Sequence, residues 1–161
     1  MRPIPTPSAR RAALGVVAAL TGAAGCTTAS TTSSSAASPC NVLSSRQAGR
    51  LLGAASDHVS VDGIDGRICN YRVSHGSGSP PAVLSVTVDR STKAVDAFRS
   101  IPDSPQLTIV TVAGRRAVWT SPTGGSLISE SRGAVVTITP LNVPNAQHVA
   151  EQAMREAFAH L

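Results

Sequence analysis

The amino-acid sequence predicts an α+β domain: an antiparallel β-sheet with an N-terminal and a C-terminal helix packed on one face, and one disulfide. Three observations favour this class. A capped amphipathic segment opens the folded part of the chain, and a longer one closes it. Between them, short runs rich in β-branched residues are separated by pairs of residues that contain glycine. Helices at both ends and strands between them are typical of α+β layering.

The first helix is predicted just after Ser44. Ser44 and Gln47 have the spacing of a capping box, in which each side chain bonds to the backbone of the other residue. Gly53 is a stop signal, because glycine readily adopts the left-handed conformation that ends a helix. One apolar face runs through Leu43, Ala48, Leu51, Leu52 and Ala55.

The first strands are predicted in the next segment. Residues 57–67 read as irregular structure or a weak strand with a turn, and residues 68–73 and 82–90 as two strands joined by the loop 74–81. In the second of these strands, apolar residues alternate with Ser85, Thr87 and Asp89. We therefore expect a sheet with one solvated face.

A short helix over 91–101, capped by Ser91 or Thr92, is followed by two prolines and then by β structure over 107–140. Three pairs divide this stretch into a meander of three or four strands: Ala113-Gly114, Gly124-Gly125 and Arg132-Gly133.

The last helix is predicted after Asn145, which can cap it. Its inward positions are Ala146, Val149, Ala150, Ala153, Met154, Ala157, Phe158 and Leu161, and Gln147, His148, Glu151, Gln152, Arg155 and Glu156 form the solvated face.

Residues 1–25 have the layout of a secretory signal, with Arg2, Arg10 and Arg11 before an apolar run over 12–24. That run is shorter than the about 20 residues that a spanning helix needs. The run ends in Ala-Ala-Gly-Cys, which resembles the lipobox of bacterial lipoproteins and predicts lipidation of Cys26. We therefore expect a protein anchored by lipid to the extracytoplasmic face of the cell membrane. The alternative is a plain secreted protein in which Cys26 is incidental.

Residues 26–38 are predicted to be the lipidated cysteine and a Ser/Thr/Ala tether, followed by a single domain over 39–161. Without large apolar side chains the tether cannot form a core, and as a coil it spans roughly 20 Å. Removal of the leader also removes three arginines, so the net charge falls from +5 to +2. The basic character of the full chain therefore gives no reason to expect nucleic-acid binding.

The chain has three cysteines. If Cys26 carries a lipid, Cys40 and Cys69 remain as a pair in a compartment where disulfides persist. A bridge between them would contribute roughly 3–4 kcal/mol in the chain-entropy description. The alternative is two free, buried thiols.

The start of the folded part, with Pro39, Cys40, Leu43, Cys69 and Tyr71, resembles actinobacterial envelope lipoproteins of the domain of unknown function 3558 family. In that family a Pro-Cys start opens a helix, and a second cysteine follows on a strand, often with an aromatic residue two positions later. Tyr71 stands where the family more often has tryptophan. The resemblance covers the lipobox and about the first third of the mature chain. It implies a disulfide-bonded surface lipoprotein and carries no established activity.

The search for chemistry identifies no catalytic motif, no metal site and no cofactor-binding loop. Asp62 and Asp65 lie near glycines but lack the further oxygen ligands of a calcium loop, so a turn is favoured. Three residues are ligand-binding candidates. Arg115 and Arg116 could bind an anionic group, although such a pair is commonly an edge or a turn, and Trp119 is either an exposed ring or part of the core.

These observations lead to three hypotheses. The leading one is a non-enzymatic binding module that presents its domain to another envelope protein. The second is a carrier of an apolar ligand such as a lipid, held in a cavity that the small residues of the last helix leave open; the same residues equally allow close packing. The third, an envelope hydrolase, has no nucleophile–base pair to name.

Overall fold

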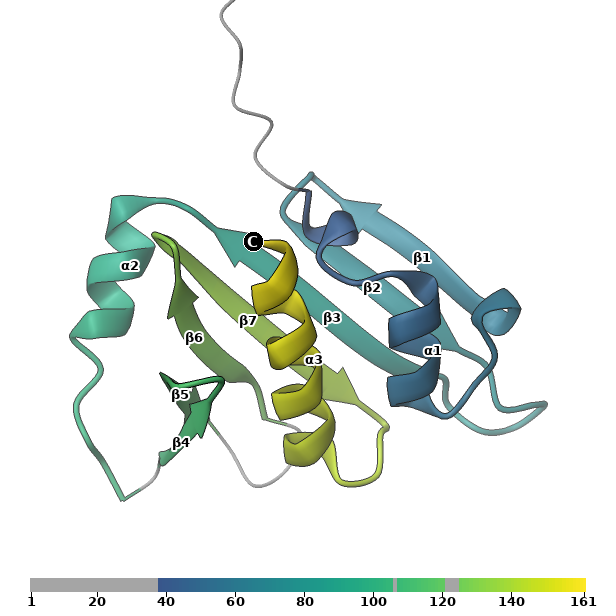
Figure 1. The fold of residues 1–161 in the computed structure, drawn as a ribbon. Coiled ribbons are helices and arrows are strands. Elements are labelled where there is room, and N and C mark those ends of the chain that lie inside the picture. Colours follow the sequence, from purple (N-terminus) through teal and green to yellow (C-terminus); the bar gives the residue numbers. More distant parts are fainter. Residues whose placement is uncertain (1–37, 106, 121–124) are drawn as a thin grey trace, which may run out of the picture. The chain divides into compact units, whose positions relative to one another are not determined.

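Seven antiparallel strands form one sheet in the order β1-β2-β3-β7-β6-β5-β4 (Figure 1). The computed structural model describes residues 38–161 except 106 and 121–124, so the predicted leader, Cys26 and nearly all of the tether lie outside the described residues. In chain order the elements are η1 (Pro39–Asn41), α1 (Ser45–Leu52), η2 (Ser56–His58), β1 (Val59–Ile64), β2 (Ile68–Val73), β3 (Ala82–Asp89), α2 (Thr92–Arg99), β4 (Thr108–Val112), β5 (Arg115–Trp119), β6 (Leu127–Ser131), β7 (Ala134–Leu141) and α3 (Ala146–His160). In this part of the chain, no helix is long and apolar enough to cross a bilayer.

The sheet consists of two meanders, β1–β3 and β4–β7, which meet where β3 pairs with β7. Their register runs from Val83 opposite Leu141 to Asp89 opposite Val135. Two-residue turns close the hairpins β4–β5 and β6–β7, and the three residues 65–67 connect β1 to β2. In each of these connections the first two residues have positive φ, as in Arg132 (50°) and Gly133 (71°), which matches the right-handed twist of the paired strands. The predicted meander therefore has four strands.

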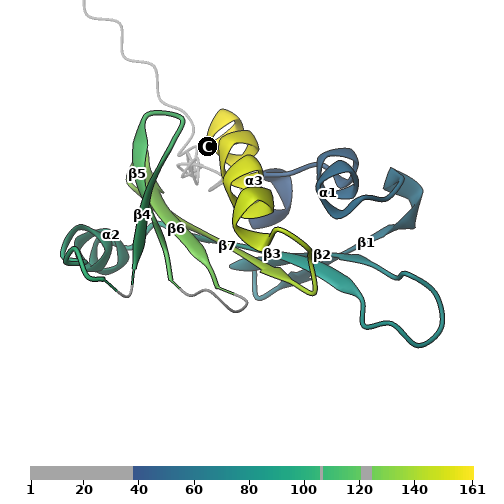
Figure 2. The same ribbon diagram turned by 90° about the horizontal axis from the view of Figure 1, so that it is seen from below.

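Helices α1 and α3 pack side by side on one face of the sheet, as Figure 2 shows. The core between them and the sheet contains fully buried side chains from every layer. The largest are Tyr71, Leu43, Leu84, Leu127, Ile138 and Met154. The predicted α+β class, with its two terminal helices on one face, is confirmed.

Helix α2 packs on the opposite face of the sheet. Its buried Val95 and Phe98 contact Val118 and Val135 in a second, smaller apolar cluster. Ser91 caps the helix by accepting a hydrogen bond from the backbone of Ala94. At its other end, the Arg99 guanidinium donates two hydrogen bonds, of 2.8 and 2.7 Å, to the Glu130 carboxylate. These bonds lower the pKa of Glu130.

The ends of α1 follow the local prediction. Ser44 accepts from the Gln47 backbone, Gln47 accepts from the Ser44 backbone, and Gly53 is left-handed after the last turn. The predicted cap of α3 by the Asn145 side chain is absent. Helix α3 begins directly after Asn145, but its side chain makes no capping hydrogen bond. Asn145 has left-handed backbone angles (φ 53°, ψ 44°), whereas a capping side chain normally comes from an extended residue.

The predicted disulfide is present: the Cys40 and Cys69 sulfurs are 2.10 Å apart and close a loop with a sequence separation of 29. Two residues further along β2, the fully buried Tyr71 reaches the same N-terminal segment. Its hydroxyl donates to the Leu43 carbonyl oxygen at 2.6 Å and lies 3.3 Å from that of Cys40. Burial raises the pKa of Tyr71 above its ordinary value of 10.0. Together these contacts fix residues 40–43 on β2.

We expect Tyr71→Phe to lower the free energy of unfolding by about 1–2 kcal/mol at neutral pH, because the buried Leu43 carbonyl loses its donor. The raised pKa also predicts a pH dependence. The stability contributed by the neutral hydroxyl is fully present below pH 10.0 and is lost as the pH rises through the folded-state pKa. Urea unfolding of both proteins from pH 7 upward checks this. The chain has one tyrosine, so its tyrosinate absorbance reports this group alone.

The difference between wild type and Tyr71→Phe should narrow at high pH, because only the wild type has this hydroxyl to ionise. A constant difference across the alkaline range would contradict the raised pKa.

Candidate binding cleft

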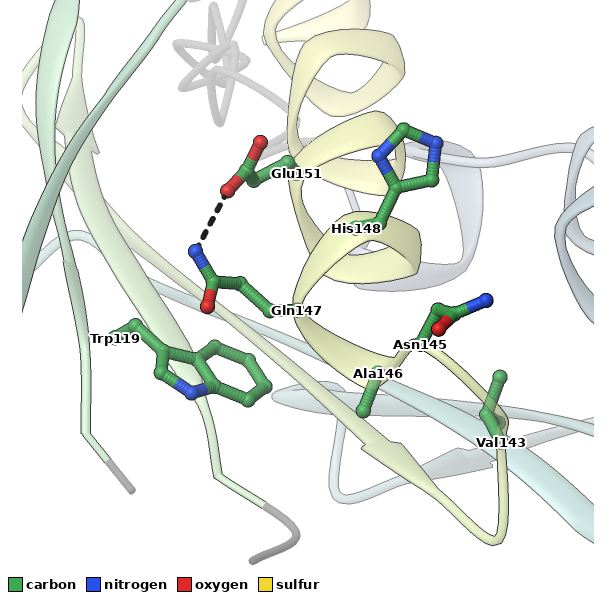
Figure 3. A pocket seen from close by; sticks show the side chains of 7 residues that line it. All are labelled: Trp119, Val143, Asn145, Ala146, Gln147, His148 and Glu151. Carbon is green, nitrogen blue, oxygen red and sulfur yellow. Dashed lines mark hydrogen bonds between the residues drawn. The ribbon is translucent and has the colours of Figure 1, made fainter. Parts of the chain in front are cut away.

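A cleft of about 730 Å³, open to solvent, lies where α3 begins beside the end of β5. Its described lining residues are Trp119, Val143, Asn145, Ala146, Gln147, His148 and Glu151 (Figure 3). One wall is thus an indole ring, and the other is the first two turns of a helix. Hydrogen-bonding groups and apolar surface line the cleft in nearly equal measure.

The connection from β7 to α3 positions the helical wall. Asn142 and Asn145 both have left-handed backbone angles, so the chain reverses within four residues. The Asn142 amide donates to the Pro81 carbonyl oxygen at 3.0 Å and holds this turn against the end of the β2–β3 loop. The first helical hydrogen bond then runs from the Val149 N–H to the Asn145 carbonyl at 3.1 Å.

The polar side chains of the cleft are held by bonds along α3. The Gln147 amide donates to the Glu151 carboxylate at 3.0 Å, and that carboxylate is 4.0 Å from the Arg155 guanidinium. On the neighbouring stripe of the helix, His148 and the Gln152 amide are 2.9 Å apart. In the view of Figure 3, Gln147 extends from α3 between the Trp119 ring and Glu151. These groups offer donors and acceptors in fixed positions.

Trp119 is only 6% exposed. It lies opposite Leu127 in the register of β5 with β6, and its ring belongs to the main core. Of the two interpretations that the sequence allowed, the structure places Trp119 in the core, where it also forms the apolar wall of the cleft. Its small exposed fraction leaves little ring surface on which a ligand could stack.

Arg115 and Arg116 do not converge, because successive residues of a strand point to opposite faces of the sheet. The Arg115 guanidinium lies over the Phe158 ring of α3, 5.2 Å from its centroid. The Arg116 guanidinium lies over the Phe98 ring of α2 at 5.7 Å. It also donates to the Ile101 carbonyl at 3.1 Å and to Asp103 at 3.2 Å. Each arginine thus joins β5 to a different helix, and the structure forms no paired-arginine site.

The remaining sequence candidates, Asp62 and Asp65, lie on the surface away from the cleft. Asp62 is 3.7 Å from the Arg72 guanidinium on the face of the sheet opposite α1 and α3, and Asp65 occupies the β1–β2 turn. Asp57 and His58 are 3.7 Å apart with both side chains more than 70% exposed. Within the described ranges, no group of three or more His, Cys, Asp or Glu side chains lies close enough to hold a metal ion.

Sequence reasoning did not identify Gln147, His148 and Glu151 as site residues. Their helical positions predict only a solvated face, which any polar surface residue shares. They form a wall because β5 ends beside α3, and that proximity depends on the pairing of the second meander. No local signal distinguishes them from Gln152 or Arg155, one turn further along.

A second hollow, of about 400 Å³, lies between α2 and the face of the sheet opposite α1 and α3. Its described lining is mostly apolar: Ala94, Ala97, Phe98, Ile101, Ile128 and Val135, with Thr87, Asp89 and Thr137 completing it. It is also open to solvent. By contrast, the space between α3 and the sheet is filled, since Ala150, Ala153 and Ala157 are fully buried in the main core.

Comparison with protein-family models, curated proteins and solved structures finds no match to this chain.

We expect Arg116→Ala to lower the free energy of unfolding by about 1–2 kcal/mol, because it removes the ring contact with Phe98 and the bonds to the segment after α2. Arg115→Ala is the matched control and should cost about 0.5–1 kcal/mol, since it loses only an exposed ring contact. Urea unfolding followed by the fluorescence of the single tryptophan measures both. Equal effects of the two substitutions would contradict the role of Arg116 as the attachment of α2.

Proposed function

We propose that this chain is a lipoprotein anchored through Cys26 at the extracytoplasmic face of the cell membrane, in the group that its first folded segment resembles. The observation that carries the proposal is the use of the cysteines. The Cys40–Cys69 disulfide takes two of the three, which leaves Cys26 alone directly after the apolar run of the leader. An internal disulfide supports an oxidising compartment, and a single cysteine after such a run supports a lipid attachment site.

We propose further that the domain is a non-enzymatic binding module for another envelope protein. The cleft beside Trp119 supports this function, because it is open and presents amide, carboxylate and imidazole groups to a polar partner. Among its described lining residues there is no serine, threonine or cysteine that could act as a nucleophile. The arrangement therefore supports recognition through hydrogen bonds.

The hollow beneath α2 favours a second candidate function, the carriage of an apolar ligand such as a lipid. Its floor of Ile128 and Val135 and its wall of Ala97 and Phe98 suit an aliphatic chain. A buried ligand site normally encloses most of its ligand, however, and this hollow is open to solvent. The filled layer beneath α3 also leaves the carrier without the cavity on which that hypothesis depended. The binding module is therefore the better supported of the two.

For the anchor, we expect the protein expressed in cells to fractionate with membranes and to carry a diacylglycerol-modified Cys26 at its N-terminus. Cys26→Ser should release the domain in soluble form, because two acyl chains give stable anchoring and none remains. Detergent-phase partitioning and mass spectrometry of the N-terminal peptide measure both properties. Recovery of wild-type protein without lipid would show that Cys26 is incidental.

For the binding module, we expect a photoreactive amino acid in place of His148 to form a discrete adduct with an envelope protein in living cells. The same group in place of Arg46, an exposed residue of α1 outside the cleft, is the matched control. Glu151→Ala removes the acceptor that holds Gln147 and should abolish the adduct without unfolding the domain.

Equal labelling from both positions would contradict a partner at the cleft. Native mass spectrometry of residues 27–161 tests the carrier function separately from the binding module. A lipid mass that Ala97→Phe removes and Gln147→Ala retains would place a ligand in the hollow beneath α2.

A further inference from the structure

One end of the sheet gathers the segments that lie next to the predicted tether. Ile68, just after the β1–β2 turn, pairs with Thr87 near the end of β3, and the last residue of β3, Asp89, pairs with Val135 just after the β6–β7 turn. Pro39, where the chain enters the domain, lines a hollow of about 300 Å³ with Gly66, Arg67 and residues 87–91. In Figure 1 the start of the described chain lies beside the β1–β2 turn, and the β6–β7 turn lies at the same end of the sheet, on the other side of β3. We call this the tether end.

Four exposed cationic side chains occur at the tether end, each in a connection or the first turn of a helix: Arg67, Arg90, Lys93 and Arg132. We refer to these four as the basic rim. None of them forms an ion pair of 4.0 Å or less with another described residue, unlike Arg50, Arg72, Arg99, Arg116 and Arg155. Their charges are therefore available to a partner outside the domain.

Several carboxylates lie near the basic rim. Asp65 shares the β1–β2 turn with Arg67, and Asp89 follows in the same hollow. Asp89 accepts a hydrogen bond from the Ser91 backbone at 2.8 Å, and this bond, with a smaller contribution from Arg67, lowers its pKa. Further along α2, Asp96 lies near Arg99, which Glu130 already binds. The four cations of the rim thus exceed the two carboxylates in the same connections.

The opposite end of the sheet has a different charge. The described connections at this end include 53–58, 74–81, 100–105 and 142–145, and these contain no lysine or arginine. Their ionisable side chains are Asp57, His58, His75 and Asp103. The domain is therefore asymmetric along its strands, with cations at the end where the chain enters. An exposed apolar residue, Ile64 (42% exposed), completes the tether end beside the β1–β2 turn.

We propose that the basic rim is a membrane-docking surface that binds the anionic headgroups of phospholipids. The charge of the rim and its position at the tether end both point to this partner. Lysine and arginine at a membrane surface are attracted by anionic lipids within about one Debye length, roughly 8–10 Å. Arg67 and Arg90 line the same hollow as Pro39, where the predicted tether that leads to Cys26 joins the domain, so a lipid anchor would bring this end of the sheet toward the bilayer. This inference rests on the proposed lipid anchor for its location, and on the described charges for its chemistry.

Docking by this end also determines which way the cleft points. The cleft lies at the N-terminal end of α3, beside the connection 142–145, and so at the end of the sheet remote from the rim. A domain that rests on its basic rim presents the Trp119 cleft away from the bilayer. Its partner can then approach without contacting lipid.

The test uses residues 27–161 without lipid, so that binding reports the domain surface and not the anchor. Residues 38–161 contain the complete core and the disulfide, which makes this segment a folded unit. We expect it to float with phosphatidylglycerol vesicles at low ionic strength, to remain unbound with phosphatidylcholine vesicles, and to dissociate in high salt.

A rim variant carries Arg67→Gln, Arg90→Gln, Lys93→Gln and Arg132→Gln. A matched control carries Arg46→Gln, Arg50→Gln, Arg72→Gln and Arg155→Gln, which removes the same charge from exposed positions elsewhere. Each membrane-facing cation is worth about fivefold in partitioning. We therefore expect the rim variant to lose binding by more than about tenfold and the control by less than about threefold. Circular dichroism melting curves check that both variants are folded.

Equal losses in the two variants would mean that only net charge matters, and the docking surface would be rejected. Equal binding of wild type to both kinds of vesicle would reject it as well. Because this segment lacks Cys26, these results do not depend on whether the full chain is lipidated. Failure of the anchor and failure of the basic rim are thus distinguishable.

Discussion

The attachment of residues 40–43 to β2 is the constraint on which the helical layer depends. The Cys40–Cys69 disulfide and the hydrogen bond from Tyr71 to Leu43 hold the segment that leads into α1. Helix α1 then lies beside α3, where Gln47 and Arg50 both contact Glu156. Without this attachment, an eight-residue helix would have to remain on the sheet through its own apolar face alone. The covalent bond therefore stabilises a layer that local helix propensity could not.

This arrangement separates two surfaces that the proposed function needs. The N-terminal attachment brings the chain into the domain beside the β1–β2 turn, and the long β3–β7 pairing joins this region to the second meander. Helix α3 spans the sheet from one end to the other, so the cleft at its start is remote from the point where the chain enters. Strand β5 is joined to α3 through Arg115 and to α2 through Arg116. The walls of the cleft are thus supported from both faces of the sheet.

Predictions from the sequence succeeded where the signal is local. The Ser44–Gln47 capping box, the stop at Gly53 and the turns at Ala113-Gly114 and Arg132-Gly133 each depend on a few consecutive residues. The predicted turn at Gly124-Gly125 includes residue 124, which lies outside the described residues. The disulfide followed from the three cysteines of the chain, since a lipid on Cys26 leaves Cys40 and Cys69 as a pair. Predictions were poorer where a side chain's role depends on distant neighbours. Asn145 precedes α3 but does not cap it, and the adjacent arginines belong to opposite faces of the sheet.

By itself the sequence determined the class of the domain and the places of its three helices, because periodicity, capping and turn chemistry act over a few residues, and the number of cysteines indicated the disulfide. It left open whether residues 57–67 form a strand and whether residues 107–140 contain three strands or four. Only the tertiary structure decided that α2 covers the opposite face and that Gln147 and Glu151 face Trp119 across a cleft. It also decided that Gly49 must lack a side chain, since a Cβ there would lie 2.7 Å from the Ala54 carbonyl oxygen. Contacts of this kind join residues whose proximity is set by strand order and register, and a pattern along the chain does not carry that information.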